Sequence, residues 1–142
     1  MLASAIIAAQ PASALVRVAN DSGGQIGPYL DRLASLRSSG QSVMIDGPCL
    51  SACTLLLGVI PRERLCATSR AKLGFHAAWK PDAAGNKRLS PEGTKSLWDI
   101  YPSSVRAWLA RQGGLKTRMV YLSGSELASI VATCPPQSAS VR

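Results

Sequence analysis

Residues 43–59 read VMIDGPCLSACTLLLGV, and this stretch decides the fold of the chain. An apolar strand is expected over residues 43–46, and a Gly-Pro turn closes it. Ser51 then precedes an apolar run over residues 52–59, which predicts a buried helix with Ser51 at its start. A strand that leads through a tight turn into a buried helix is typical of α/β proteins with parallel strands.

The rest of the chain continues this alternation of strands and helices. Further strands are predicted at residues 15–19, 64–67, 72–76 and 119–122. The first predicted helix has Pro28 in its first turn and stops at Ser38-Ser39-Gly40. Further helices are predicted from Ser90 to Gly113 with a break at Pro102, and from residue 124 to 131 behind a Ser123–Glu126 capping box. Residues 77–89 are predicted to form a mobile loop. The pattern indicates an α/β fold with a mostly parallel sheet flanked by helices.

Composition and charge narrow the choice of partners. The 142 residues are 46% hydrophobic and 17% charged, which fits one globular domain, and their formal net charge is +8. The basic residues are scattered, and no aromatic side chains interleave with them as base-stacking platforms. We therefore expect a solvated basic surface and no nucleic-acid partner. No stretch approaches the roughly eighteen apolar residues of a transmembrane helix, so no stable membrane span is expected.

The chain has four cysteines, at positions 49, 53, 66 and 134. Their spacing lacks the short pairs or histidine partners of a zinc site, so no metal is expected. An even number predicts two disulfides formed in an oxidising compartment, with three possible pairings. Four reduced structural cysteines are the alternative.

The N-terminus also favours an oxidising compartment. Residues 2–9 are apolar, and Ala12-Ser13-Ala14 resembles a signal-peptidase site. We expect residues 1–14 to be a truncated signal peptide, residues 15–134 to be the domain and residues 135–142 to be a tail, in a periplasmic or secreted protein. A plain first strand with a ragged lead is the alternative for the N-terminus.

Two residues carry the chemical interest. Ser51 precedes a helix, where backbone N–H groups can stabilise an anion, although a serine there is also a common helix cap. His76 is the only histidine and follows an apolar strand; the alternative role is a partly buried imidazole bonded to a backbone carbonyl. If both lie at one rim of a parallel sheet, the imidazole can take the serine proton. The α/β-hydrolase pattern G-x-S-x-G is not matched.

Three motifs give the chain a specific resemblance. Asn20-Asp21-Ser22-Gly23-Gly24 is followed by a helix, then by Cys49-Leu50-Ser51-Ala52-Cys53, and Gly74-Phe75-His76 ends 25 residues after the serine. In this order and spacing the chain resembles the proteolytic subunit of Clp protease and the crotonase-like superfamily. It is most similar to bacterial Clp-like periplasmic proteins with a C-x-S-A-C-T motif, an Arg, here Arg62, and then G-F-H.

The resemblance covers about residues 15–134 and implies site roles. Ser51 would be the nucleophile, His76 the general base, and the backbone N–H groups of Gly24 and Ala52 the oxyanion hole. The substrate would be a peptide or related acyl compound, and no cofactor is implied.

The chain departs from that family in two places. Met119 falls where the family has its acid, and Met cannot hold an imidazole in one tautomer. Asp82, Asp99 or a backbone carbonyl could replace the acid. The first βα unit is absent, so the fold would be a minimal version. A homo-oligomer is compatible with it, but a Clp-type ring with an unfoldase is not implied.

The cysteines lie around this expected site. A Cys66–Cys134 disulfide would staple the terminal helix to the sheet, and a Cys49–Cys53 disulfide would tighten the turn around Ser51. A catalytic role for Cys53 is less favourable, because a nucleophile inside an apolar helix is poorly exposed.

Three functions are compatible with the sequence. The first is a serine hydrolase with a Ser51–His76 dyad and an unidentified third group. The second is a non-catalytic binding module that keeps the cleft, motivated by Met119. The third is an acyl-thioester enzyme of crotonase type, in which the serine would be unnecessary.

Overall fold

A parallel sheet forms the first part of the molecule. The structure, a computed structural model, describes residues 14–136, so most of the expected signal segment and of the expected tail lies outside the described residues. Strands pair in the order β1 (Leu15–Val18), β2 (Ser42–Ile45) and β4 (Leu65–Ala67), all parallel. The three apolar residues of β2, at positions 43–45, are all buried.

A second three-stranded sheet carries the serine segment. It has the order β3 (Pro48–Leu50), β5 (Lys72–Phe75) and β8 (Val120–Ser123), with β3 parallel and β8 antiparallel to β5. The chain passes from the first sheet to the second at Gly47. A Cβ atom there would lie 2.0 Å from the carbonyl oxygen of Ala19, so only glycine allows this close approach. The predicted strands are present, but they divide between two small sheets.

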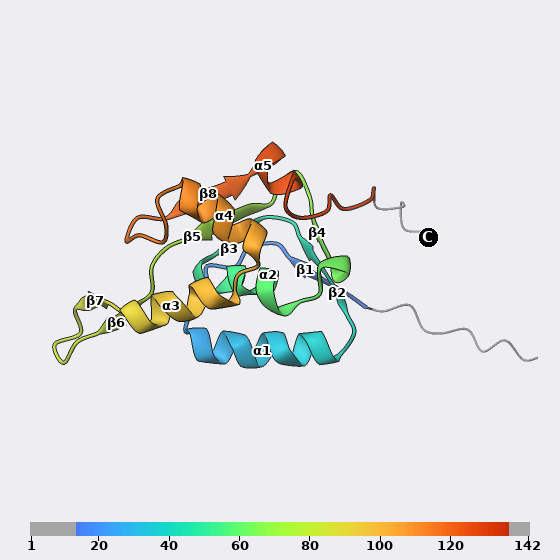
Figure 1. Cartoon of the computed structure of the whole chain (residues 1–142). Coiled ribbons are helices and arrows are strands. Elements are labelled where there is room, and N and C mark those ends of the chain that lie inside the picture. Colours follow the sequence, from blue (N-terminus) through green and yellow to red (C-terminus); the bar gives the residue numbers. More distant parts are fainter. Residues whose placement is uncertain (1–13, 137–142) are drawn as a thin grey trace, which may run out of the picture.

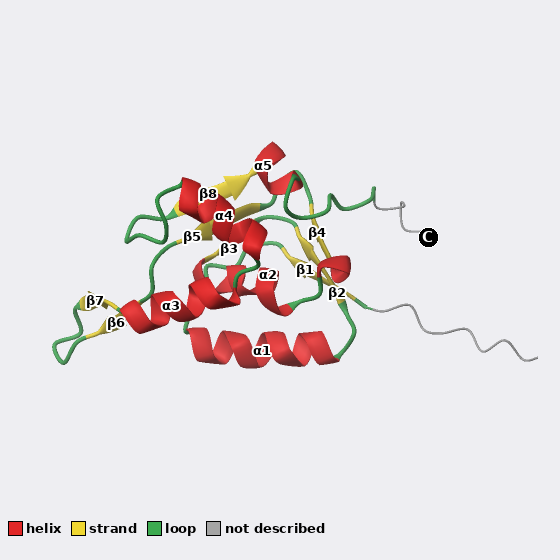
Figure 2. Ribbon diagram, viewed as in Figure 1, coloured by secondary structure: helices red, strands yellow, loops and turns green. Residues whose placement is uncertain are grey.

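Helices cover both sides of the strands. Figure 2 shows α1 along the lower side and α5 at the upper side, with the two three-stranded sheets between them and α4 overlapping the second sheet in this view. The helices are α1 (Ile26–Ser38), α2 (Leu56–Val59), α3 (Pro91–Ile100), α4 (Ser103–Arg111) and α5 (Gly124–Ala128), with short 3₁₀ helices η1 (Ser51–Leu55) and η2 (Arg62–Arg64). α1 packs against η1 and α2. None of the helices within residues 14–136 combines the length and apolar character that crossing a bilayer requires.

Two helix predictions need correction. The expected α-helix over residues 52–59 is a 3₁₀ helix followed by a single α-helical turn, because apolar content alone does not distinguish the two helix types. The last helix ends at Ala128 rather than at residue 131. The predicted capping box is also wrong: Ser123 makes no side-chain cap, and the Glu126 carboxylate accepts the indole N–H of Trp108 at 2.8 Å.

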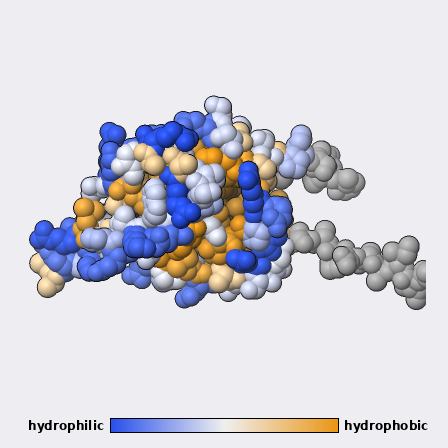
Figure 3. All heavy atoms as spheres, viewed as in Figure 1, coloured by the Kyte–Doolittle hydropathy of each residue, from blue (hydrophilic) through white to orange (hydrophobic). Residues whose placement is uncertain are grey.

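Residues 77–89 contain a β-hairpin, so the prediction of a loop is wrong. Strands β6 (Trp79–Pro81) and β7 (Lys87–Leu89) pair antiparallel and project from the body next to α3 (Figure 1). The Asp82 carboxylate accepts the backbone N–H groups of Ala84 and Asn86, each at 2.9 Å, and so closes the turn. The projecting end has a mostly hydrophilic surface (Figure 3).

An aromatic cluster fills the core between the second sheet and the helices. The ring of Phe75 lies 5.3 Å from that of Tyr101 and 5.6 Å from that of Trp108, between ring centroids. All three side chains are almost fully buried. Large aromatic side chains contribute much of the burial energy of a small core, so this cluster fixes β5 against α3 and α4.

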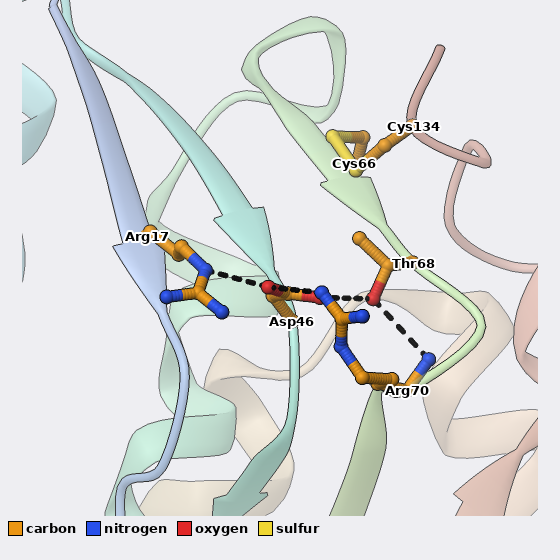
Figure 4. Close-up of polar contacts among 6 residues, drawn as sticks. All are labelled: Arg17, Asp46, Cys66, Thr68, Arg70 and Cys134. Carbon is orange, nitrogen blue, oxygen red and sulfur yellow. Dashed lines mark hydrogen bonds and ion pairs between the residues drawn. A yellow bond between two sulfur atoms is a disulfide. The ribbon is translucent and has the colours of Figure 1, made fainter. Parts of the chain in front are cut away.

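The C-terminal segment is tied to the first sheet. A disulfide joins Cys66 in β4 to Cys134, and the N–H of Cys134 donates to the carbonyl of Ala67 at 3.0 Å (Figure 4). The second disulfide joins Cys49 to Cys53. The four cysteines are therefore all paired, and the alternative of reduced cysteines is not supported.

A buried carboxylate stands at the end of β2. Asp46 is 4% exposed and accepts hydrogen bonds from Arg17 at 2.5 Å, Thr68 at 2.7 Å and Arg70 at 2.8 Å (Figure 4). The hydrogen bonds from Arg70, Thr68 and Arg17 hold the pKa of Asp46 well below its usual range. A buried charge is tolerated when it is paired and fully hydrogen-bonded, and this one connects β1, β2 and the turn after β4.

Candidate active site

Parallel pairing of β3 and β5 brings Ser51 and His76 to one edge of the second sheet. Leu50, the last residue of β3, lies opposite Gly74, and β5 ends one residue later at Phe75. Ser51 and His76 each follow directly after the end of a strand. Because neighbouring parallel strands end at the same edge, the two side chains emerge side by side.

Ser51 has an unusual backbone conformation. Its φ angle is +56°, and within residues 14–136 it is the only non-glycine residue with a positive φ. The Cys49–Cys53 disulfide spans it, with both cysteines buried. A serine held in the left-handed region between a strand and a helix presents its hydroxyl at the sharpest point of the turn. Such conformations cost free energy and concentrate at functional sites.

A glycine turn packs directly against Ser51. Backbone hydrogen bonds of 2.8 Å tie Asp21 to Pro48 and Leu50, which fixes residues 20–24 alongside β3. Gly23 has a φ of +85°, and a Cβ atom there would lie 2.6 Å from the Cβ atom of Ser51. No residue other than glycine fits this contact without displacing Ser51.

The two predicted oxyanion-hole donors lie in these adjoining segments. A Cβ atom on Gly23 would also lie 3.0 Å from the backbone nitrogen of Ala52, so the glycine turn and the start of η1 are in contact. Neither the Gly24 N–H nor the Ala52 N–H has a hydrogen-bond acceptor within the described part of the chain. Both donors are free for a ligand oxygen.

The imidazole of His76 makes two hydrogen bonds. Its Nε2 atom lies 3.0 Å from the Ser51 hydroxyl oxygen, and its Nδ1 atom lies 2.6 Å from the carbonyl oxygen of Ala77. A carbonyl only accepts, so Nδ1 carries the proton and Nε2 accepts from Ser51. The N–H of Ala77 in turn donates to the carbonyl of Lys116 at 2.6 Å, which fixes the peptide that orients the ring.

Of the three candidates for the missing acid, the backbone carbonyl is the one that faces the ring. Asp82 binds Arg88 and its own turn, and Asp99 pairs with Lys95. Met119 lies against Gly74, where a Cβ atom would be 2.4 Å from its sulfur, so it fills space beside the dyad. Every residue has a carbonyl, so no side-chain identity in the sequence marks Ala77 for this position.

A buried hydroxyl pair supports the Ser51 turn and was not predicted. The Thr54 hydroxyl donates to the carbonyl of Ser51 at 2.7 Å and contacts the Tyr101 hydroxyl at 2.6 Å. Because Thr54 uses its proton on Ser51, Tyr101 donates to Thr54. Burial raises the pKa of Tyr101 to about 12, which keeps it protonated for this bond. A Thr and a Tyr 47 residues apart give no recognisable signal in the sequence.

A cavity of about 330 Å³ opens beside His76, between the β6–β7 hairpin and the segment that leads into β8. Within residues 14–136 no group of three or more His, Cys, Asp or Glu side chains is arranged to hold a metal ion. The chemical groups gathered at this edge are therefore a hydroxyl, an oriented imidazole and free backbone N–H groups. Together they can transfer a proton and bind an oxyanion.

Comparison with known proteins shows the fold and no family. No family model and no curated protein sequence matches the chain. It is similar to the structure of a ClpP1 mutant from Listeria monocytogenes, with 13% identity, a TM-score of 0.48, and 84% of this chain and 71% of that chain covered. It is also similar to a peptidase from Plasmodium falciparum, with 8% identity, a TM-score of 0.52, and 83% of this chain and 75% of that chain covered. The fold assignment depends on the second likeness, and the predicted α/β fold is confirmed.

Proposed function

We propose that this protein is a serine hydrolase that cleaves peptide or related acyl bonds, with Ser51 as nucleophile and His76 as general base. The observation that carries the proposal is the 3.0 Å contact between the Ser51 hydroxyl and Nε2 of an imidazole whose other nitrogen is already bonded to Ala77. This arrangement leaves the lone pair of Nε2 directed at the proton that it must remove.

The proposed reaction has two half-reactions. The Ser51 oxygen attacks the acyl carbon while its proton moves to Nε2, and the Gly24 and Ala52 N–H groups bind the oxyanion. Nε2–H then protonates the leaving amine or alcohol, the bond to it breaks, and an acyl-serine remains. Water attacks this ester with His76 again as base, and the acid product leaves as Ser51 regains its proton.

In this site a backbone carbonyl takes the place of the carboxylate that is the third group of a Ser-His-Asp enzyme, and this affects the expected rate of hydrolysis. The Ala77 oxygen holds the same tautomer that an acid would hold, but its dipole stabilises the imidazolium less than a full negative charge. In a Ser-His-Asp enzyme, replacing the Asp with Asn costs about 10⁴-fold, in part because the tautomer is wrong. In this site the Ala77 carbonyl holds the correct tautomer. We therefore expect a slow hydrolase whose rate is reduced by less than about 10⁴-fold relative to an enzyme with the carboxylate.

The second candidate is a binding module that uses the same cleft without chemistry. Met119 at the expected acid position favours it, as does the absence of a carboxylate bonded to His76 among residues 14–136. Such a module would bind a peptide or acyl group with an affinity that survives Ser51→Ala and His76→Ala, and it would show no turnover at any pH.

We further propose that the protein acts in the periplasm or is secreted. Two disulfides are typical of an extracellular or otherwise oxidising compartment. The bond between Cys49 and Cys53 would hold the nucleophile turn only while that compartment keeps it oxidised.

Labelling with a fluorophosphonate tests the enzyme proposal. The purified, oxidised protein should gain one adduct, located on Ser51 by peptide mass spectrometry, and His76→Ala should slow the labelling by at least about 10²-fold. Ser104→Ala, which removes an exposed serine from α4, is the matched control and should label like the wild type. A folded wild-type protein that forms no adduct on Ser51 would contradict the proposal and leave the binding module.

A further inference from the structure

The cavity beside His76 has one wall made by the inner face of the projecting hairpin. In the β6–β7 ladder, Trp79 pairs with Leu89 and Pro81 pairs with Lys87. Residues two apart on a strand share a face, so the side chains of Trp79, Lys87 and Leu89 lie together on one face. Lys80 pairs with Arg88 on the other face, although Arg88 also contributes to the lining of the cavity.

The opposite wall combines apolar and polar side chains. Met119 and Thr117 come from the segment that leads into β8, and Ala77 and His76 close the end nearest Ser51. Trp79 is 46% exposed and Leu89 is 55% exposed, so two large apolar side chains are open to solvent here. Among the described residues, none that lines this cavity carries a carboxylate.

Two cations line the cavity, Lys87 and Arg88, and they differ in their partners. The Lys87 ammonium lies 4.5 Å from the ring centroid of Trp79, and it has no acidic partner within residues 14–136. By contrast, Arg88 pairs with Asp82 at 3.0 Å, and Lys80 lies 3.8 Å from Glu92.

The position of His76 indicates which side of the scissile bond would lie in the cavity. In acyl transfer the general base returns its proton to the leaving group, so the leaving group departs on the side of the imidazole. The oxyanion donors lie in the glycine turn and the start of η1, whereas the cavity lies beyond His76, toward the hairpin.

We propose that this cavity binds the leaving-group side of a peptide substrate and selects an acidic residue there, through the Lys87 ammonium and the apolar side chains beside it. This inference rests on the proposed function and names its substrate class. The peptide's carboxylate would approach Lys87, while its carbon chain would pack on Trp79, Leu89 and Met119. No covalent role is assigned to Lys87, which is a specificity-determining residue.

Two short leucine- and alanine-based peptides that differ only in a central Glu or Gln test the proposal. Binding is measured by fluorescence anisotropy to Ser51→Ala, which cannot turn the peptides over. At low salt we expect the Glu peptide to bind about two- to five-fold tighter than the Gln peptide, the range of a solvent-exposed ion pair, and the preference to shrink as salt is added. Lys87→Gln in the Ser51→Ala background should abolish the preference.

Lys80→Gln is the matched control, because it removes the same charge from the opposite face of the same hairpin. It should leave the preference intact. Equal binding of the two peptides, absence of binding of both, or equal effects of the two lysine substitutions would overturn the subsite.

Hydrolysis of the same peptides by the wild-type protein separates this inference from the proposed function. Cleavage mapped by mass spectrometry on the N-terminal side of Glu would support both. Cleavage without a preference for Glu would overturn the subsite and leave the hydrolase. A Lys87-dependent binding preference without any cleavage would support the subsite and contradict the hydrolase.

Discussion

Two polar clusters stand at strand ends in this molecule, one on each three-stranded sheet. At the end of β2, the buried Asp46 carboxylate has three hydrogen-bond donors from three segments. At the ends of β3 and β5, Ser51 shares a hydrogen bond with His76, whose other ring nitrogen bonds to the carbonyl of Ala77. The N–H groups of Gly24 and Ala52 beside them have no acceptor within the described residues. In the first cluster the buried carboxylate is fully hydrogen-bonded, and the cluster connects the strands of the first sheet. The second cluster keeps unpaired N–H donors, and Ser51 has a positive φ. Both features are expected of a site that acts on a ligand.

The largest effect on fluorophosphonate labelling should come from Gly23→Ala, which disturbs only the cluster of Ser51 and His76. The added Cβ atom would lie 2.6 Å from the carbonyl oxygen of Leu50 and 2.6 Å from the Cβ atom of Ser51. Ser51 must move to relieve the contact, and a misplacement of about 1 Å can cost 10²-fold in rate. We expect fluorophosphonate labelling to slow by ~10²-fold or more.

Gly85→Ala is the matched control for this substitution. Gly85 has a φ of +84°, close to that of Gly23, but no atom lies within 4 Å of its added Cβ atom. It should cost about 1–2 kcal/mol of unfolding free energy from the backbone alone and leave labelling unchanged. Equal labelling of both variants would show that the glycine turn does not position Ser51.

Each cluster also has its own disulfide, and removing them one at a time sharpens the comparison. Cys66 and Cys134 are 68 residues apart, whereas Cys49 and Cys53 are 4 apart. In the chain-entropy model the long loop contributes about 4 kcal/mol and the short one about 2 kcal/mol. Replacing both members of the long pair with Ala should therefore lower the unfolding free energy more.

Activity should respond in the reverse order. Loss of the Cys49–Cys53 bond frees the turn that holds Ser51, so labelling should slow in this variant and remain near wild type in the other. Denaturant unfolding and labelling rates on the same two proteins check this. A long-pair variant that loses labelling while still folded would contradict the separation of the two clusters.

The smallest effect is the pH dependence contributed by Asp46. The pKa of Asp46 is lower in the folded protein than in the unfolded chain, where it is about 4. The ionised carboxylate therefore stabilises the fold above about pH 4, and this stabilisation is lost as the pH falls below that value. Asp46→Asn should therefore be less stable than the wild type near neutral pH, with a gap that narrows below about pH 4. Labelling of Ser51 should not change.

Asp31→Asn provides the control for loss of one negative charge, because Asp31 is exposed on α1. It should follow the wild-type thermal unfolding midpoint across the same pH range. An Asp46→Asn variant that is as stable as the wild type at neutral pH would mean that the cluster does not hold the first sheet.

The sequence was sufficient to predict the second cluster's main contact. Ser51 and His76 each follow an apolar strand, and parallel strands bring such positions to one edge. The group that orients His76 was not predictable in the same way. It is the carbonyl of Ala77, and a backbone atom leaves no mark in side-chain identity.

Other features were missed because the deciding interactions are not local. Strands β6 and β7 are three residues each and contain Pro, Lys and Arg, so they lack the apolar alternation of a strand, and the Asp82 turn was the only available signal. The division into two sheets depends on the approach of Gly47 to Ala19, which are 28 residues apart. The role of Glu126 depends on Trp108 in another helix, which no capping pattern includes.

The proposed chemistry requires that Ser51 donates to Nε2 of a His76 ring protonated on Nδ1. Since His76 is the only histidine, ¹⁵N labelling of histidine gives one imidazole to observe by NMR. In the neutral ring we expect a protonated Nδ1 and an unprotonated Nε2 whose resonance shifts in Ser51→Ala. A ring protonated on Nε2, or an Nε2 resonance unaffected by Ser51→Ala, would contradict it.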